Sequence, residues 1–173
     1  VGANGEVIVF DHQKNDEVQG YDGKEDITGF ALRDSLIVWT EAHPEKNFVL
    51  FDTRSEKERW RIDGPRSAVS PLIVNSLTIM VGVNGTVMAY SLANSSESWT
   101  YKVSDRVFAD PLLFGEEIII GTVNGKISGI DAHTGSQRWQ KQLKEPVTTI
   151  GRDDSLLLVG TQTGKMMALN RSE

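Results

Sequence analysis

The stretch Gly129–Trp139 reads GIDAHTGSQRW: an apolar strand closes on Asp131, and a tryptophan follows the aspartate by eight residues. The same arrangement recurs along the chain. Apolar segments close on a short polar residue at positions 11, 52, 91, 131 and 170, at intervals of 41, 39, 40 and 39 residues. Trp60, Trp99 and Trp139 each follow their closing residue by eight positions. The sequence is therefore a repeat with a period of about forty residues.

Each repeat contains short segments rich in Val and Ile, separated by Gly, Asn, Asp and Ser, which is typical of strands joined by tight turns. Asn84-Gly85 and Asn124-Gly125 predict type I′ hairpins, in which both central residues need a positive φ. We expect four antiparallel strands per repeat. In the clearest repeat they are predicted near Val107–Leu113, Glu117–Thr122, Lys126–Ile130 and Ser136–Gln142.

A four-stranded meander cannot bury both faces alone, so copies at this period should stack around a common axis as the blades of a β-propeller. The predicted fold class is all-β, with about four blades of four-stranded antiparallel sheet. We expect one propeller segment over residues 1–173, with partial blades at 1–24 and 145–173 and blades at about 25–64, 65–104 and 105–144. It would form part of a seven- or eight-bladed propeller, completed by further residues or by a second copy through its open blade edges.

Composition excludes several classes of function. The net charge is −6 without a long basic run, which disfavours nucleic acid as a partner. There is no cysteine, so a thiolate metal site and a thiol nucleophile are excluded. No apolar stretch approaches the roughly 20 residues that span a bilayer, so membrane insertion is not expected. No histidine pair or calcium loop has metal-ligand spacing, and we expect neither a cofactor nor a metal.

The segment Gly129–Trp139 resembles the PQQ-like repeat family, whose pattern is approximately A-x-D-x-x-T-G-x-x-x-W. Other copies are degenerate: Leu50–Trp60 keeps the aspartate and tryptophan, and Ala89–Trp99 keeps the alanine and tryptophan. The resemblance implies that the indole of one blade docks against the Thr-Gly turn of its neighbour. The blade-docking residues expected on this basis are Trp60, Trp99, Trp139, Asp52, Asp131, Thr134 and Gly135.

The family includes quinoprotein dehydrogenases, but their catalytic features have no counterpart here, and no residue can be assigned a reaction. The leading hypothesis is a non-enzymatic protein-interaction, scaffold or sensor module. Non-catalytic relatives such as an outer-membrane barrel assembly lipoprotein and the sensor domains of membrane kinases favour an extracytoplasmic location: periplasmic, cell-surface or lumenal. The alternative is a fragment of a PQQ- and calcium-dependent dehydrogenase whose catalytic residues lie outside this chain.

Partner binding is expected on loops. The segment Trp39–Asn47 lengthens one hairpin of the repeat, and inserted loops on one face often carry function in repeat proteins. Phe108 and the stretch Arg61–Arg66 are weaker candidates at connections between blades. The turns at Asp34, Glu117 and Asp154 form an acidic rim, which solvation explains more simply than binding. The candidate partner-binding loop residues are Glu41, His43, Pro44, Glu45 and Lys46.

Overall fold

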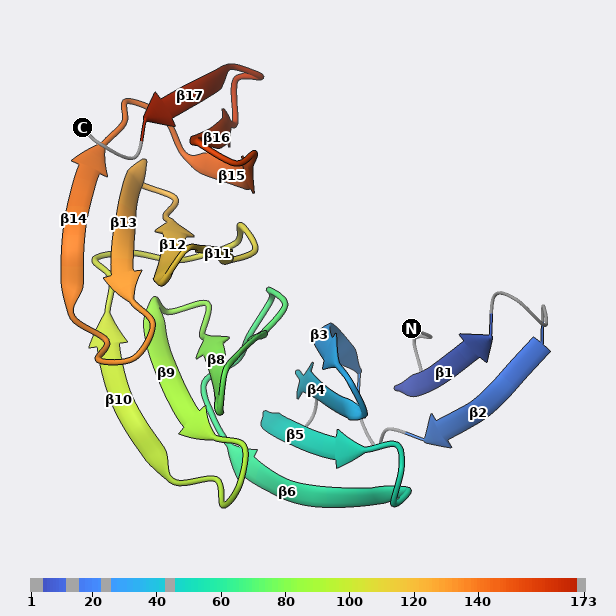
Figure 1. Cartoon of the computed structure of the whole chain (residues 1–173). Helices are drawn as coiled ribbons and strands as arrows, with labels where there is room; N and C mark the ends of the chain where they lie inside the picture. The colour runs from blue at the N-terminus through green and yellow to red at the C-terminus, as the bar shows by residue number, and fades with distance from the viewer. Residues whose placement is uncertain (1–4, 12–15, 23–25, 43–45, 171–173) are drawn as a thin grey trace.

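The computed structural model describes residues 5–11, 16–22, 26–42 and 46–170, and these contain strands and no helix. The strands form five antiparallel sheets, arranged as blades along an open arc (Figure 1). The predicted all-β propeller class is confirmed. The number of blades in the complete ring remains a prediction.

Three blades are complete and two are partial, and each runs in sequence order as a meander. Blade 1 contains β1 (Glu6–Asp11) and β2 (Asp16–Asp22). Blade 2 contains β3 (Ile27–Arg33), β4 (Leu36–Glu41), β5 (Asn47–Asp52) and β6 (Lys57–Asp63). Blade 3 contains β7 (Leu72–Val74), β8 (Leu77–Val81), β9 (Thr86–Ser91) and β10 (Glu97–Lys102). Blade 4 contains β11 (Leu112–Phe114), β12 (Glu117–Gly121), β13 (Lys126–Asp131) and β14 (Gln137–Gln142). Blade 5 contains β15 (Val147–Arg152), β16 (Leu156–Thr161) and β17 (Met166–Asn170).

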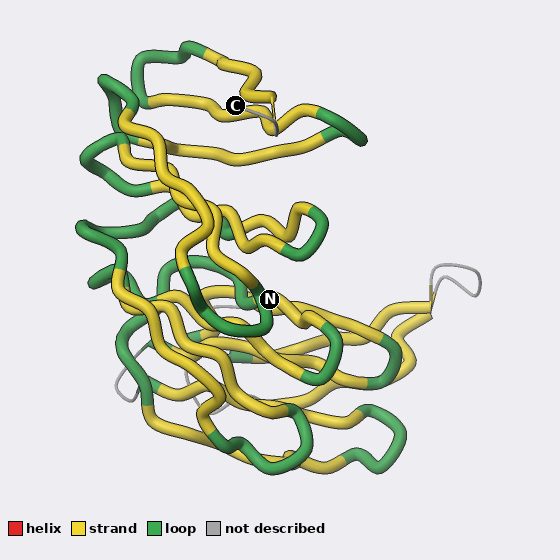
Figure 2. Tube along the Cα trace, turned by 60° about the vertical axis from the view of Figure 1, so that its left-hand side comes forward, coloured by secondary structure: helices red, strands yellow, loops and turns green. Residues whose placement is uncertain are grey.

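The meander gives the arc two distinct rims. The fourth strands, β6, β10 and β14, lie on the outside of the arc, and the loops gather at the two ends of the strands (Figures 1 and 2). We call one end the turn rim: it carries the turns at 34–35, 75–76, 115–116 and 153–155, and those at 53–56, 92–96 and 132–136. The other end is the connector rim: it carries the hairpins at 82–85, 122–125 and 162–165, residues 42 and 46, and the connections between blades at 64–71, 103–111 and 143–146.

The apolar core lies between the blades rather than at one centre. Val87 and Ile79 of blade 3 form one cluster with Ile118 and Ile130 of blade 4, and all four are almost completely buried. Similar clusters fill the seams between blades 1 and 2, 2 and 3, and 4 and 5. Each blade is therefore buried on a face only where a neighbour covers it, which is the physical reason for the repeat.

The hairpin turns differ from the predicted type I′. Gly85 and Gly125 have φ of 83° and 79°, but Asn84 and Asn124 are not in the left-handed region. The amide of Gly85 donates to the carbonyl of Gly82 over 2.8 Å, as in a type I turn followed by a left-handed glycine. The three-residue loop explains the error, because the glycine stands one position after the central pair of the turn.

The first strand of blade 4 was also predicted too early. It spans Leu112–Phe114, not Val107–Leu113. Residues before it cross from the outer edge to the inner edge of the arc, and the amide of Val107 donates to Val83 of the preceding blade over 3.2 Å. Pro111 has no amide hydrogen, so the strand ladder begins only after it.

Candidate functional site

Two tryptophans connect successive blades through their indole nitrogens. Nε1 of Trp60 in blade 2 donates to the carbonyl oxygen of Leu92 in blade 3 over 3.3 Å. Nε1 of Trp99 in blade 3 donates to the carbonyl of Ala132 in blade 4 over 3.2 Å. Each indole thus places its apolar ring in the seam and its single donor on a turn of the following blade.

Gly135 accommodates the Trp99 ring. It has φ of +71°, and a Cβ at this position would lie 2.6 Å from the ring. Trp139 behaves differently: its Nε1 donates to Oε2 of Glu117 over 2.9 Å, within blade 4 itself. A Cβ on Gly129 would lie 2.2 Å from that same nitrogen, so a glycine is needed beside this indole as well.

The two aspartates that close β5 and β13 each fix a turn on the turn rim. Oδ1 of Asp131 accepts from the amides of Thr134 and His133 over 2.8 and 2.9 Å, and Oδ2 accepts from Arg138 Nε over 3.1 Å. The Thr134 amide bond, together with the Arg138 guanidinium, lowers the pKa of Asp131 well below its usual range. The hydroxyl of Thr134 hydrogen-bonds that of Ser136 over 3.1 Å.

Asp52 has the same surroundings in blade 2. It accepts from Arg59 Nε over 3.1 Å and from the Arg54 amide over 3.0 Å, and the bond from Arg59 is the main cause that lowers its pKa. Arg59 and Arg138 occupy equivalent positions, one residue before the blade tryptophan. These groups are therefore engaged with their own turns.

Glu41, the first of the candidate loop residues, is enclosed. Its side chain is 0% exposed, and its carboxylate accepts from Trp39 Nε1 over 2.9 Å and from Asn47 Nδ2 over 3.1 Å. Arg61 completes the site with an ion pair. The expectation that Glu41 contacts a partner is therefore corrected: a buried carboxylate needs these donors, and it cannot reach solvent.

Of the other candidate loop residues, the structure describes Lys46, which lies on the connector rim. Lys46 is exposed, and its carbonyl accepts from the amide of Gly64 over 2.9 Å, which joins the loop to the connection between blades 2 and 3. His43, Pro44 and Glu45 lie outside the described residues. The two sequence candidates, the loop and the blade connection, are thus neighbours on one rim.

Phe108 is the large apolar side chain exposed on the connector rim of blade 4. It is 52% exposed, and the guanidinium of Arg106 lies 6.0 Å from its ring centroid. The backbone just before it is held by both adjacent blades: the Val107 amide donates to the carbonyl of Val83 in blade 3, and the carbonyl of Arg106 accepts from the amide of Val123 in blade 4 over 3.0 Å. Phe108 is therefore presented by a fixed backbone between two hairpins.

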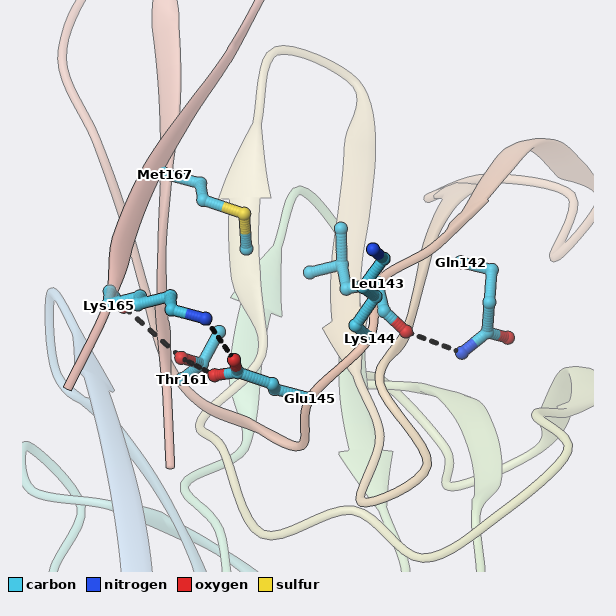
Figure 3. Close-up of a pocket in the computed structure, with 7 residues that line it drawn as sticks. All are labelled: Gln142, Leu143, Lys144, Glu145, Thr161, Lys165 and Met167. Carbon is cyan, nitrogen blue, oxygen red and sulfur yellow. Dashed lines mark hydrogen bonds and ion pairs between the residues drawn. The ribbon is translucent and has the colours of Figure 1, made fainter. Parts of the chain in front are cut away.

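A hollow of about 280 Å³ opens between blades 4 and 5 on the same rim. Figure 3 shows Met167, Lys165 and Glu145 directed toward it, with Leu143 on the opposite wall. Glu145 accepts from Lys165 Nζ over 2.5 Å and from Thr161 Oγ1 over 2.7 Å, and Lys165 is the main cause that lowers the pKa of Glu145 to about 2.

Sequence reasoning missed this clasp, by which we mean the bonds that Glu145, between blades 4 and 5, accepts from Thr161, Thr163 and Lys165 of blade 5. The available signal was the hairpin at 162–165, where Thr163 replaces the asparagine of the two preceding hairpins. In those hairpins the asparagine caps its own turn, as Asn124 Oδ1 does for the Lys126 amide over 3.2 Å. The hydroxyl of Thr163 instead donates to Glu145.

Exposed cations gather on the connector rim, although the whole chain is acidic. They are Lys46, Arg66, Lys102, Arg106, Lys144 and Lys165. Exposed carboxylates among the described residues of this rim and its strand ends are fewer: Asp26, Asp63 and Asp110. On the turn rim, Glu117 is buried against Trp139 and so does not contribute to the predicted acidic surface.

A family model described as outer membrane protein assembly factor BamB matches residues 24–173. The chain belongs to this family. The predicted resemblance to PQQ-like repeat propellers is confirmed. No curated protein sequence matches the chain.

Solved structures with the same fold include BamB from Moraxella catarrhalis, with a TM-score of 0.84 and 22% identity over 98% of this chain. The chain spans about half of that protein, 53% of its length. Two computationally designed proteins, Ika8 and Ika4, also match, each at 17% identity. Ika8 has a TM-score of 0.84 over 97% of this chain and 53% of its own, and Ika4 has 0.76 over 86% and 92%. At these identities the likeness shows the propeller fold alone.

The BamB-family chain shows no metal centre in its described part, where no three His, Asp or Glu side chains come together as ligands. Its described residues also form no helix long and apolar enough to cross a bilayer. The geometry described above holds the blades together through the seams, and it presents a basic and aromatic surface on the connector rim.

Proposed function

We propose that this chain is a non-catalytic protein-interaction module of an extracytoplasmic BamB-family propeller, and that it takes part in the assembly of outer-membrane proteins through its connector rim. Membership of a family of outer-membrane protein assembly factors supports a role in assembly, and the exposed surface of the connector rim supports binding to a protein partner. The observation that carries the proposal is Phe108, exposed beside Arg106 on a backbone that both adjacent blades hold.

Aromatic and arginine side chains contribute more to protein interfaces than their area suggests, because a rigid ring loses little entropy on binding and a guanidinium offers several donors. The surrounding lysines would attract an acidic partner surface and speed its association. The hollow beside Leu143 and Met167 offers an apolar contact at the next seam. Lys46 extends the same surface to blade 2.

The blade-docking role of the repeated residues is part of this proposal. The bonds from Trp60 and Trp99 to the following blades, and the turn bonds of Asp52 and Asp131, support a scaffold function that keeps the rim in one shape. Thr134, Gly135 and Trp139 belong to the same assembly in blade 4. Because these side chains are engaged in structure, we assign none of them to catalysis.

A photo-crosslinking amino acid at position 108, incubated with an envelope extract that contains outer-membrane proteins and their assembly partners, tests the proposal. We expect one dominant protein product, identified by mass spectrometry, and its loss in the variant Arg106→Glu. The control carries the crosslinker at Ala93, an exposed position on the turn rim. Equal products from both positions, or none from 108, would refute the connector-rim interface. Addition of pyrroloquinoline quinone with calcium should leave the melting temperature unchanged.

A further inference from the structure

A second cavity, of about 390 Å³, lies on the opposite side of the arc, on the turn rim. Three blades contribute to it. Arg33 comes from the end of β3, Asn75 from the turn between β7 and β8, and Glu116 and His133 from two turns of blade 4. Ile73 and Leu113 provide apolar lining. Its volume falls within the range of about 300–1,000 Å³ that is usual for small-molecule sites.

Arg33 is held over this cavity by a neutral acceptor. Its Nη2 donates to the backbone carbonyl of Asn75 in the next blade. Among the described residues, the ion pairs of arginine belong to Arg59, Arg61 and Arg138, and none includes Arg33. The guanidinium is therefore fixed in position, while its charge has no carboxylate partner in the described part of the chain.

The acidic group at the edge of the cavity already has a cation nearby. Oε2 of Glu116 lies 3.6 Å from Arg138 Nη2, and Glu116 is 70% exposed. The exposed imidazole of His133 adds a hydrogen-bonding group on the same wall. Among the described residues that line the cavity, Arg33 thus carries a positive charge without an ion pair, beside an apolar lining.

We propose that this turn-rim cavity binds a carboxylate carried next to an apolar group, with Arg33 as the anion-binding residue. A guanidinium presents parallel N–H donors that match a carboxylate, and such charge-assisted bonds are about twice as strong as neutral ones. Ile73 and Leu113 would contact the apolar part of the ligand. The site is separate from the connector rim, so its failure would leave the proposed interaction surface untouched.

Two sources of the carboxylate can be distinguished by titration. The probes are N-acetyl-leucine, which carries a terminal carboxylate beside an aliphatic side chain, and N-acetyl-glutamate α-amide, which carries a side-chain carboxylate. N-acetyl-leucinamide is the neutral control. We expect the acids, and not the amide, to shift the backbone amide NMR signals of Arg33, Asn75 and His133. The acid that binds more tightly identifies the source.

Variants separate binding from folding. Arg33→Gln should weaken binding by at least about tenfold, the loss expected for one charge-assisted hydrogen bond. Arg152→Gln, at an exposed arginine beside the equivalent turn of blade 5, should leave it unchanged. Glu116→Gln, on an exposed side chain that does not hold the fold, should strengthen binding by about threefold by removing a like charge.

The inference is overturned if the neutral amide produces the same shifts, if neither acid produces any, or if Arg33→Gln binds as well as the unaltered chain. Melting temperatures of all variants are measured in parallel. If Arg33→Gln proves unstable, the binding of the acids to Glu116→Gln decides the outcome. Binding that is not strengthened in that variant overturns the inference, because a site for an anion should gain affinity when a nearby negative charge is removed.

Discussion

Gly135 leaves the space that the indole ring of Trp99 occupies: a Cβ there would lie 2.6 Å from the ring, and the same tryptophan donates to Ala132, three residues earlier. A turn of blade 4 is thus shaped around a side chain of blade 3. The packing of this seam should therefore be disturbed by the addition of a single methyl group at position 135.

Gly135→Ala should destabilise the chain by about 2–4 kcal/mol, since it adds both a strained positive φ and an overpacked contact. The matched control is Gly164→Ala, because Gly164 has φ of +81° and nothing within 4 Å of its Cβ position. That variant should cost only about 1 kcal/mol from the backbone. Urea unfolding measures both. Equal losses would show that the contact with Trp99 contributes nothing.

Trp99→Phe should lower the free energy of unfolding by about 1–3 kcal/mol, because the carbonyl of Ala132 loses its donor in a buried seam. Tyr101→Phe removes a hydroxyl that donates to Gln137 in a solvent-exposed hydrogen bond from the same face of the strand, and it should cost less than about 0.5 kcal/mol. Denaturant titration compares the two. A larger loss for Tyr101→Phe would argue against a seam role of the indole.

Glu41→Gln should destabilise the seam between blades 1 and 2 by about 2–3 kcal/mol, because Arg61 loses its buried partner and Trp39 and Asn47 lose acceptor strength. Glu58 pairs with the same arginine from a side chain that is 39% exposed. Glu58→Gln should therefore cost less than about 1 kcal/mol. Thermal melting followed by tryptophan fluorescence reports both changes.

The clasp at Glu145 predicts a pH dependence. The pKa of Glu145 is lowered from 4.5 to about 2, chiefly by its bond from Lys165. A lowered pKa means that the folded chain holds the carboxylate ionised more strongly than the unfolded chain does. Its contribution to stability is therefore full above about pH 4.5 and declines as the pH falls toward 2.

Glu145→Gln should flatten the pH profile of the melting temperature within this window. The control Asp154→Asn changes an exposed carboxylate of the turn rim and should keep the profile of the unaltered chain. If Glu145→Gln retains the full acid-dependent loss, other carboxylates cause it, and the clasp between blades 4 and 5 is not a stabilising contact.

The forty-residue period of the sequence predicted most of the fold. Tryptophans at 60, 99 and 139 with aspartates at 52 and 131 predicted blades and their order, because each sheet must bury its face against the next. The turn type and the first strand of blade 4 were mispredicted. In the first case the local loop length decided, since the left-handed glycine follows the central pair of the turn; in the second the backbone that crosses between blades before Pro111 decided.

The candidate site was harder to predict from the sequence than the fold. Glu41 looked like a loop residue, but Trp39, two positions earlier on the same face of β4, and Arg61, twenty positions later, enclose it, and the second pairing is not a local signal. Arg33 drew no attention because its partner, the carbonyl of Asn75, belongs to another blade and is a backbone atom. Such pairings depend on how the blades stack against each other, and the amino-acid sequence alone does not show this stacking residue by residue.

Two of the hydrogen bonds that join blades 3 and 4 lie at well-separated points of the seam. Near the inner strands, Asp110 Oδ1 accepts from the Ser70 amide over 2.7 Å, while Trp99 reaches Ala132 near the outer strand at the opposite rim. Two anchor points on a diagonal resist both splaying and shearing, so the wedge angle between these blades is a local property of the seam. The curvature of the arc then depends on the contacts between each pair of neighbouring blades. A propeller of this kind can therefore gain blades by duplication while the contacts at the existing seams stay the same.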